Sequence, residues 1–248
     1  MPSKMRRILQ SIAFLAAFAA AAPAGAIVGG ADDGSGFANQ VVMVLTRGED
    51  KAGFCSGVVL GPRVVLTAAH CLRPAQDMAV FFRDDKGAPV LLPVAAAASH
   101  PLYHADAVAK RIVSIDLALI ELGAPLPDRF AAPRLASGDG PDVGEAAIVA
   151  GFGVTREGEP KTGGSLRSAK LQVRAPLSRI LLWAGGAEQE GACYGDSGGP
   201  LFSSEGTVLA IVAWSAGSHG GRCGTLTQGP LVAPQRAWID ATLVRWGL

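Results

Sequence analysis

The sequence contains no cluster of lysine and arginine residues, and its formal charges nearly cancel. Its 22 basic and 21 acidic residues give a net charge of +1 over 248 residues. Proteins that bind nucleic acid carry a basic patch or stripe that neutralises phosphates. The sequence therefore predicts no nucleic-acid partner, and its charge indicates no other strongly charged partner.

Beyond its first 26 residues, the chain has no apolar run long enough to span a membrane. Those 26 residues place three lysines and arginines before an apolar stretch at 8–22, and Ala24-Gly25-Ala26 follows. This order is typical of a secretory signal peptide, the alternative being a retained N-terminal anchor. We expect removal of residues 1–26, which changes the formal net charge to −2, and a secreted or periplasmic protein without membrane attachment.

Cysteines are few, and no CxxC pair is present, which argues against a zinc site made from the four of them. Four cysteines in an exported chain predict two disulfides, but their spacing leaves three pairings open. Asp84-Asp85-Lys86-Gly87 could suggest a calcium loop, although its composition favours a hairpin turn. We therefore expect neither a metal nor another cofactor.

Only four histidines could act as a catalytic base, namely His70, His100, His104 and His219. His100 and His104 lie in a loop beside a proline, and His219 lies among glycines and serine in a turn. His70 ends an apolar run and precedes Cys71, where it could be either structural or catalytic.

What the sequence does contain is a serine between glycines, in Cys193-Tyr194-Gly195-Asp196-Ser197-Gly198-Gly199-Pro200. Glycine adopts backbone conformations closed to other residues and lets a substrate approach the main chain. The N–H groups of Gly195 and Ser197 could then stabilise an oxyanion beside the Ser197 hydroxyl. A serine in an ordinary glycine-rich turn is the alternative.

A serine nucleophile needs a base and a group that orients the base. Asp116 begins the apolar run Leu117–Leu122, where a carboxylate is costly unless it is hydrogen-bonded. Ala68-Ala69-His70-Cys71, Asp116-Leu117-Ala118-Leu119 and the Ser197 motif occur in the order His, Asp, Ser. This is the order of chymotrypsin rather than of subtilisin or the α/β-hydrolases.

With these motifs the chain resembles the trypsin/chymotrypsin-like serine proteases, as a secreted bacterial-type member. The resemblance runs from Ile27-Val28-Gly29-Gly30 through Gly151-Phe152-Gly153 to the C-terminus. It implies an endopeptidase that acts on proteins or peptides through an acyl-enzyme, with His70, Asp116 and Ser197 as the triad. Gly195 and Ser197 would form the oxyanion hole.

The resemblance also implies the pairings Cys55–Cys71 and Cys193–Cys223, and an ion pair between Asp196 and a new ammonium group at Ile27. Because Ala24-Gly25-Ala26 directly precedes Ile27, we expect signal removal itself to create that ammonium. The enzyme would then emerge active, without a separate propeptide cleavage.

The resemblance places the residue that decides charge in the substrate pocket at Gly191. Small uncharged residues there predict a roomy neutral pocket for an apolar or aromatic P1 side chain, although Glu188 and Glu190 leave a basic P1 residue possible. The family usually has serine where Ala213 stands, so Asp116 loses one donor, which backbone N–H groups near His70 could replace. The substrate-binding residues implied are Gly191, Ala192, Tyr194, Ala213, Trp214, Ser215 and Gly229.

Short runs of alternating apolar residues with many turns predict an all-β chain. We expect two six-stranded antiparallel Greek-key barrels of the chymotrypsin type and a C-terminal helix around 238–246. The barrels would occupy 27–133, with His70 and Asp116, and 134–248, with Ser197; the connector 123–141 would cross the surface. We expect a monomer. The alternatives to the protease are a catalytically silent binding protein of the same fold and an esterase with the same triad.

Overall fold

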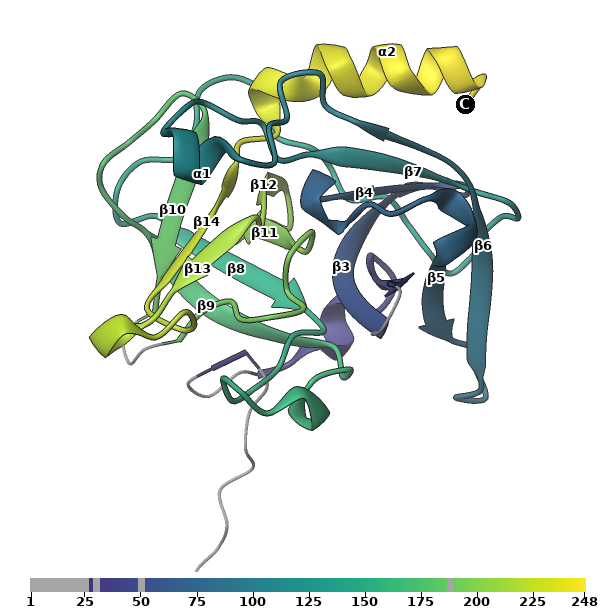
Figure 1. Cartoon of the computed structure of the whole chain (residues 1–248), viewed down its shortest axis with the longest axis horizontal. Coiled ribbons are helices and arrows are strands. Elements are labelled where there is room, and N and C mark those ends of the chain that lie inside the picture. Colours follow the sequence, from purple (N-terminus) through teal and green to yellow (C-terminus); the bar gives the residue numbers. More distant parts are fainter. Residues whose placement is uncertain (1–26, 29–31, 49–51, 187–189) are drawn as a thin grey trace, which may run out of the picture.

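The computed structural model describes residues 27–28, 32–48, 52–186 and 190–248. It is an all-β structure with short helices (Figure 1). The predicted signal peptide, residues 1–26, lies outside the described residues, as does Glu188. None of the helices in the described ranges has the length and apolarity that crossing a membrane requires.

The first half of the chain forms a closed antiparallel barrel in the order β2-β3-β4-β7-β6-β5, which confirms the predicted six strands. Valine, isoleucine and leucine alternate along these strands and fill the interior, with Val42, Val44 and Ile120 fully buried. The strands are β2 (Val41–Arg47), β3 (Ala52–Gly61), β4 (Val64–Thr67), β5 (Met78–Arg83), β6 (Pro89–Ser99) and β7 (Ala118–Leu122).

The turn between β5 and β6 is the predicted hairpin. The Asp84 carboxylate accepts hydrogen bonds from the backbone N–H groups of Lys86 at 2.9 Å and Ala88 at 2.8 Å. Asparagine and aspartate close turns in this way. The carboxylate that suggested a calcium loop is thus occupied by the main chain.

The second half forms a barrel-like antiparallel sheet in the order β12-β11-β8-β9-β10-β14-β13, and β1 (Asp32–Asp33) pairs with β9. Strand β12, at one end of this order, bridges through Ala210 to Leu231, the residue that follows β14. The strands are β8 (Ala146–Gly151), β9 (Arg167–Val173), β10 (Leu181–Gly185), β11 (Pro200–Ser203), β12 (Val208–Ile211), β13 (Trp214–Ala216) and β14 (Leu226–Pro230).

This second sheet departs from the predicted six strands. The run Val208–Trp214 divides into β12 and β13, and β14 ends at Pro230. The sheet also gains β10 and the short β1, neither of which was predicted.

The described residues form two α-helices, α1 (Ala107–Lys110) and the predicted C-terminal helix α2 (Arg236–Trp246), which lies across one end of the molecule (Figure 1). Trp238 of α2 contacts His100 edge-to-face, with ring centroids 4.8 Å apart. His100 lies in a loop as expected, but it is buried, and burial lowers its pKa. The short 3-10 helices are η1 (Gly34–Phe37), η2 (Ala69–Cys71), η3 (Ala75–Asp77), η4 (Pro160–Thr162), η5 (Ser218–Gly220) and η6 (Ala233–Gln235).

The two halves meet through a buried polar contact centred on Ser56 of β3. Its hydroxyl donates to Gly195 O and accepts from Phe152 N, both at 2.9 Å. Its own N–H donates to Ser197 O at 2.8 Å. Strand β3 of the first barrel therefore holds the serine loop of the second.

Candidate active site

The serine loop adopts a backbone that requires glycine. Gly195 has φ +98° and Gly198 has φ +82°, in the left-handed region. A Cβ at Gly195 would come within 2.3 Å of the Phe54 ring, and one at Gly198 within 2.0 Å of Thr67 Oγ1. The loop therefore packs directly against β3 and β4 of the first barrel.

Two backbone donors beside Ser197 remain unused. Within the described ranges, neither the Gly195 N–H nor the Ser197 N–H donates a hydrogen bond, whereas Gly198 N donates to Val212 O at 2.7 Å. Buried and partly buried N–H groups normally have partners. The two free N–H groups flank Asp196, and a pair of free donors of this kind can form an oxyanion hole.

His70 and Asp116 form a two-point contact. Asp116 Oδ2 lies 2.6 Å from His70 Nδ1, and Asp116 Oδ1 accepts a hydrogen bond from the backbone N–H of His70 at 2.9 Å. The carboxylate side chain is 19% exposed and the imidazole 37%. A hydrogen bond donated by Nδ1 to Asp116 places the imidazole proton on Nδ1 and leaves the lone pair on Nε2.

This contact also answers the question raised by Ala213. Alanine offers no hydroxyl to Asp116, and Ala213 N donates to Gln228 O at 2.9 Å instead. The backbone N–H of His70 supplies the compensating donor, as predicted.

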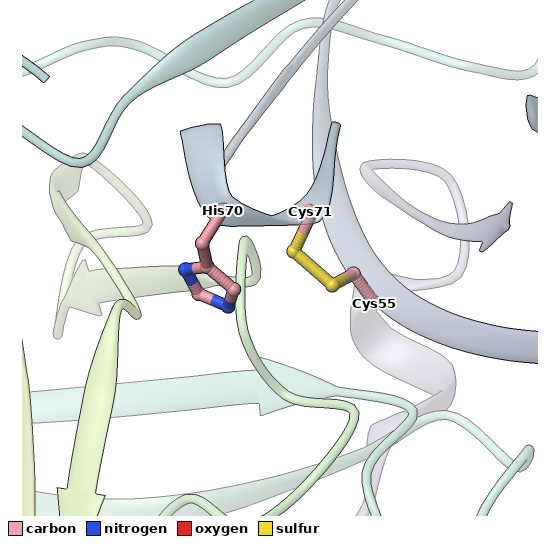
Figure 2. A group of neighbouring side chains, drawn as sticks. All are labelled: Cys55, His70 and Cys71. Atoms are coloured by element: carbon pink, nitrogen blue, oxygen red, sulfur yellow. A yellow bond between two sulfur atoms is a disulfide. The ribbon is translucent and has the colours of Figure 1, made fainter. Parts of the chain in front are cut away.

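A disulfide links the histidine turn to the strand that holds the serine loop. Cys55 of β3 is bonded to Cys71, the residue after His70, and Figure 2 shows the imidazole and this disulfide on the same turn. Cys71 Sγ lies 3.9 Å from Ser197 O, so the Ser197 backbone is adjacent to the histidine turn. The structure also pairs Cys193 with Cys223.

The same three residues, Cys55, His70 and Cys71, are the one group in the described part of the chain whose spacing resembles a metal site. Both sulfurs are bonded to each other (Figure 2) and provide no thiolate. This donor set does not fit a metal ion.

Asp196 is completely buried directly before Ser197. Its carboxylate accepts hydrogen bonds from Gly153 N at 2.8 Å and Cys193 N at 2.9 Å. Burial raises the pKa of Asp196 to about 7, although these two bonds oppose the shift. No cation among the described residues pairs with it.

Ile27, the other predicted member of the activation pair, is also fully buried. It packs in the core of the second barrel with Ala192 and Leu201. The next residue, Val28, bridges to Gly191, with Gly191 N donating to Val28 O at 3.3 Å. The start of the expected mature chain thus lies against the segment that leads to Asp196.

The predicted pocket residues divide into two groups. Gly191 and Ala192 are buried side by side, while Tyr194 and Trp214 are exposed and Ser215 is partly buried. Gly229 is buried and packs closely against the end of β12, because a Cβ there would meet Ile211 O at 1.8 Å.

Thr227, two residues before Gly229 on β14, lies beside Gly191. Thr227 is fully buried opposite Ser215, its Oγ1 accepts from Ala192 N at 2.9 Å, and a Cβ at Gly191 would lie 3.0 Å from it. The register of β13 against β14, Trp214 opposite Gln228, fixes this position. Alternation along β14 puts Thr227 and Gly229 on the same face, so the sequence held no signal that separates them.

Comparison with known proteins agrees with this geometry. The Trypsin family model matches residues 27–238. Trypsin eta of Drosophila melanogaster is 32% identical over 85% of this chain and 87% of its own length. Granzyme M of Rattus norvegicus is 29% identical over 79% and 82%.

Solved structures share the fold. Mouse neuropsin, a serine protease expressed in the limbic system, superimposes with a TM-score of 0.67 at 24% identity over 81% of this chain and 93% of its own. Human heparin binding protein gives 0.71 at 22% identity over 88% and 96%. These relatives come from insects and mammals, so the comparison does not support the bacterial-type assignment. The chain belongs to the trypsin family of serine proteases and is a serine-type endopeptidase.

Proposed function

We propose that His70, Asp116 and Ser197 are the catalytic residues of a secreted endopeptidase. His70 Nε2 takes the proton of the Ser197 hydroxyl as Ser197 Oγ bonds to the scissile carbonyl carbon, and later gives that proton to the leaving amine. Water then attacks the acyl-enzyme with the same base and restores the serine. The observation that carries this proposal is the 2.6 Å contact of Asp116 with His70 Nδ1.

The free N–H groups of Gly195 and Ser197 would bind the oxyanion in both tetrahedral intermediates. Trp214-Ser215-Ala216 in β13 ends the sheet on one side, and a substrate backbone could add to it as a further strand.

Labelling with a fluorophosphonate tests the nucleophile. We expect one equivalent of label on Ser197 and none in Ser197→Ala, while Ser204→Ala, on an exposed turn, labels normally. Mass spectrometry of the labelled peptide gives the site. Intact protein that remains unlabelled would favour the catalytically silent binding protein instead. Hydrolysis of esters without hydrolysis of casein would favour the esterase.

Processing and localisation follow from the same proposal. Signal removal after Ala26 would leave Ile27 as the N-terminus of a secreted, monomeric enzyme. The burial of Ile27 beside Ala192 supports a terminus at this position, because the new ammonium would lie near the segment that contains Asp196.

For specificity, we propose a neutral pocket whose size Thr227 limits. The atoms nearest to a Cβ built at Gly191 belong to Gly224 and Thr227, which are uncharged, and this supports an apolar P1 residue. Thr227 lies against Gly191 and Ala192. The proposed pocket is therefore narrower than the roomy pocket that the sequence predicts. Small apolar P1 side chains should therefore be preferred over aromatic ones. Glu188 and Glu190 are the two acidic residues that could favour arginine at P1. Glu188 lies outside the described residues, and Glu190 packs against Gly186.

Thr227→Gly should shift the P1 preference toward phenylalanine. Removing a hydroxyl and a methyl group should raise the kcat/KM ratio for Phe over Ala by about tenfold or more, since one methylene in an apolar pocket discriminates by about 10–200-fold. A panel of peptides with P1 Phe, Leu, Ala and Arg measures this. Thr227→Ser retains the hydroxyl that binds Ala192 N and should shift the ratio less. A wild-type preference for Arg would contradict the neutral pocket.

A further inference from the structure

The second barrel has a cavity outside the proposed catalytic residues. Its volume is about 480 Å³, and it lies between the loop 138–142, the segment 173–183 and residues 231–234. None of the residues assigned above to catalysis or to the P1 pocket lines it.

Its lining suits an apolar ligand of low net charge. Pro176, Leu177, Leu181 and Trp183 supply apolar surface, and Leu177 is 56% exposed. The formal charges of the lining cancel, since it includes two arginines and two aspartates: Arg174, Arg179, Asp139 and Asp142. A pocket lined mostly by apolar side chains selects a bulky apolar group.

A row of side chains connects this cavity to β13. Trp183 of β10 lies opposite Gln228 of β14, and Gln228 lies opposite Trp214 of β13. Residues directly opposite each other on neighbouring antiparallel strands share a face of the sheet. Leu182 and Ala184, which alternate with Trp183, are buried in the barrel core, so this shared face is the outer one.

The distance along this row is short. Neighbouring strands are about 4.8 Å apart, so Trp214 and Trp183 are separated by roughly 10 Å, or about three residues of extended peptide. Trp214 is 48% exposed and is available to such a peptide. A substrate bound along β13 could therefore cross Trp214 and Gln228 and reach the cavity.

We propose that the cavity over Leu181 and Trp183 binds a bulky apolar side chain of the substrate, several residues upstream of the cleaved bond. This rests on the proposed protease function and on substrate binding along β13. The protease would thus select substrates with an apolar residue three or four positions beyond the one that contacts Trp214, in addition to its P1 residue.

Fluorogenic peptides test this. One peptide carries the P4–P2′ core alone, a second adds a Gly/Ser extension upstream of P4, and further peptides place one phenylalanine at successive positions of that extension. We expect phenylalanine at one or two positions to raise kcat/KM about tenfold over the Gly/Ser extension, mainly through KM, because the ring leaves water.

Leu177→Asp should abolish that ratio, because it puts a charge on the apolar rim of the cavity. Leu91→Asp is the matched control: Leu91 is 59% exposed on β6 of the first barrel and should leave the ratio intact. Leu177→Ser repeats the test without a new charge. Hydrolysis of the core peptide with no gain from phenylalanine at any position, or an equal loss in Leu177→Asp and Leu91→Asp, would overturn the inference but not the protease function. Failure to cleave any peptide would overturn both.

Discussion

Asp116→Asn is expected to lower kcat on a peptide substrate about 10⁴-fold with little change in KM. Asp116 Oδ2 lies 2.6 Å from His70 Nδ1, and Oδ1 accepts the His70 backbone N–H. An asparagine that still accepts from the backbone presents its NH₂ group to Nδ1. The imidazole then carries its proton on Nε2, where it cannot act as a base toward Ser197.

The absence of a second side-chain donor makes this effect depend on His70 alone. Ala213 contributes no hydroxyl. Among the described residues, only His70 hydrogen-bonds to the side chain at position 116, so His70 alone would orient the amide of Asn. Asp77→Asn is a matched control, because Asp77 is also a partly buried aspartate whose carboxylate contacts a side-chain nitrogen, that of Arg47. We expect it to retain activity. A loss of less than tenfold in Asp116→Asn would remove Asp116 from the catalytic set.

A form that keeps Ala24-Gly25-Ala26 ahead of Ile27 is expected to be at least about 100-fold less active than a form that begins at Ile27. Only the second form has an ammonium group at Ile27 to pair with Asp196. Leaving a buried charge without its partner costs about 3–5 kcal/mol, which is enough to displace the serine loop from its active geometry. Activity is measured after mass spectrometry has verified each N-terminus.

The two forms should also differ in how stability depends on pH. In the extended form, the folded-state pKa of Asp196 is raised from 3.8 to about 7. Its favourable contribution is complete below pH 3.8 and is lost as the pH rises to 7, since ionising the buried carboxyl then opposes folding. The expected loss is on the order of 4 kcal/mol. Pairing with the ammonium lowers this pKa, so the form beginning at Ile27 should lose less.

Asp196→Asn separates the two effects. It should remove this decline in the extended form and lower activity in the form beginning at Ile27, because both carboxylate oxygens accept backbone hydrogen bonds and an amide accepts only one. Asp128→Asn, on the surface, serves as the control. Equal activity of the extended and processed forms would contradict the role of Ile27.

Local signals in the sequence were sufficient to predict the first barrel. They were also sufficient to select His70, Asp116 and Ser197 as candidate site residues. Short apolar runs such as Met78–Arg83 and Ala146–Gly151 form strands, as the sequence predicts. The glycines around Ser197 also meet a local requirement, a positive φ at Gly195 and Gly198. Such features depend on the residues themselves and their immediate neighbours.

Features that depend on strand register could not be read in this way. Strand β14 begins at Leu226, within a segment of mixed composition, and its pairing with β13 places Thr227 rather than Gly229 beside Gly191. Thr227 and Gly229 are two residues apart and share a face of β14, so only the register of β14 against β13 decides which of them lies opposite Ser215. Strand β10 was missed because Leu181–Gly185 is short and ends in small residues.

The bonds of Ser56 limit how this protein can be engineered. Its hydroxyl binds Gly195 O and Phe152 N, and its N–H binds Ser197 O, so one β3 residue holds the loop that carries Ser197, the proposed nucleophile. A chimera that takes its first barrel from a relative must therefore preserve the contacts between β3 and the loop that carries Ser197. A graft of the second barrel alone would carry Ser197 without the β3 residue that positions its loop.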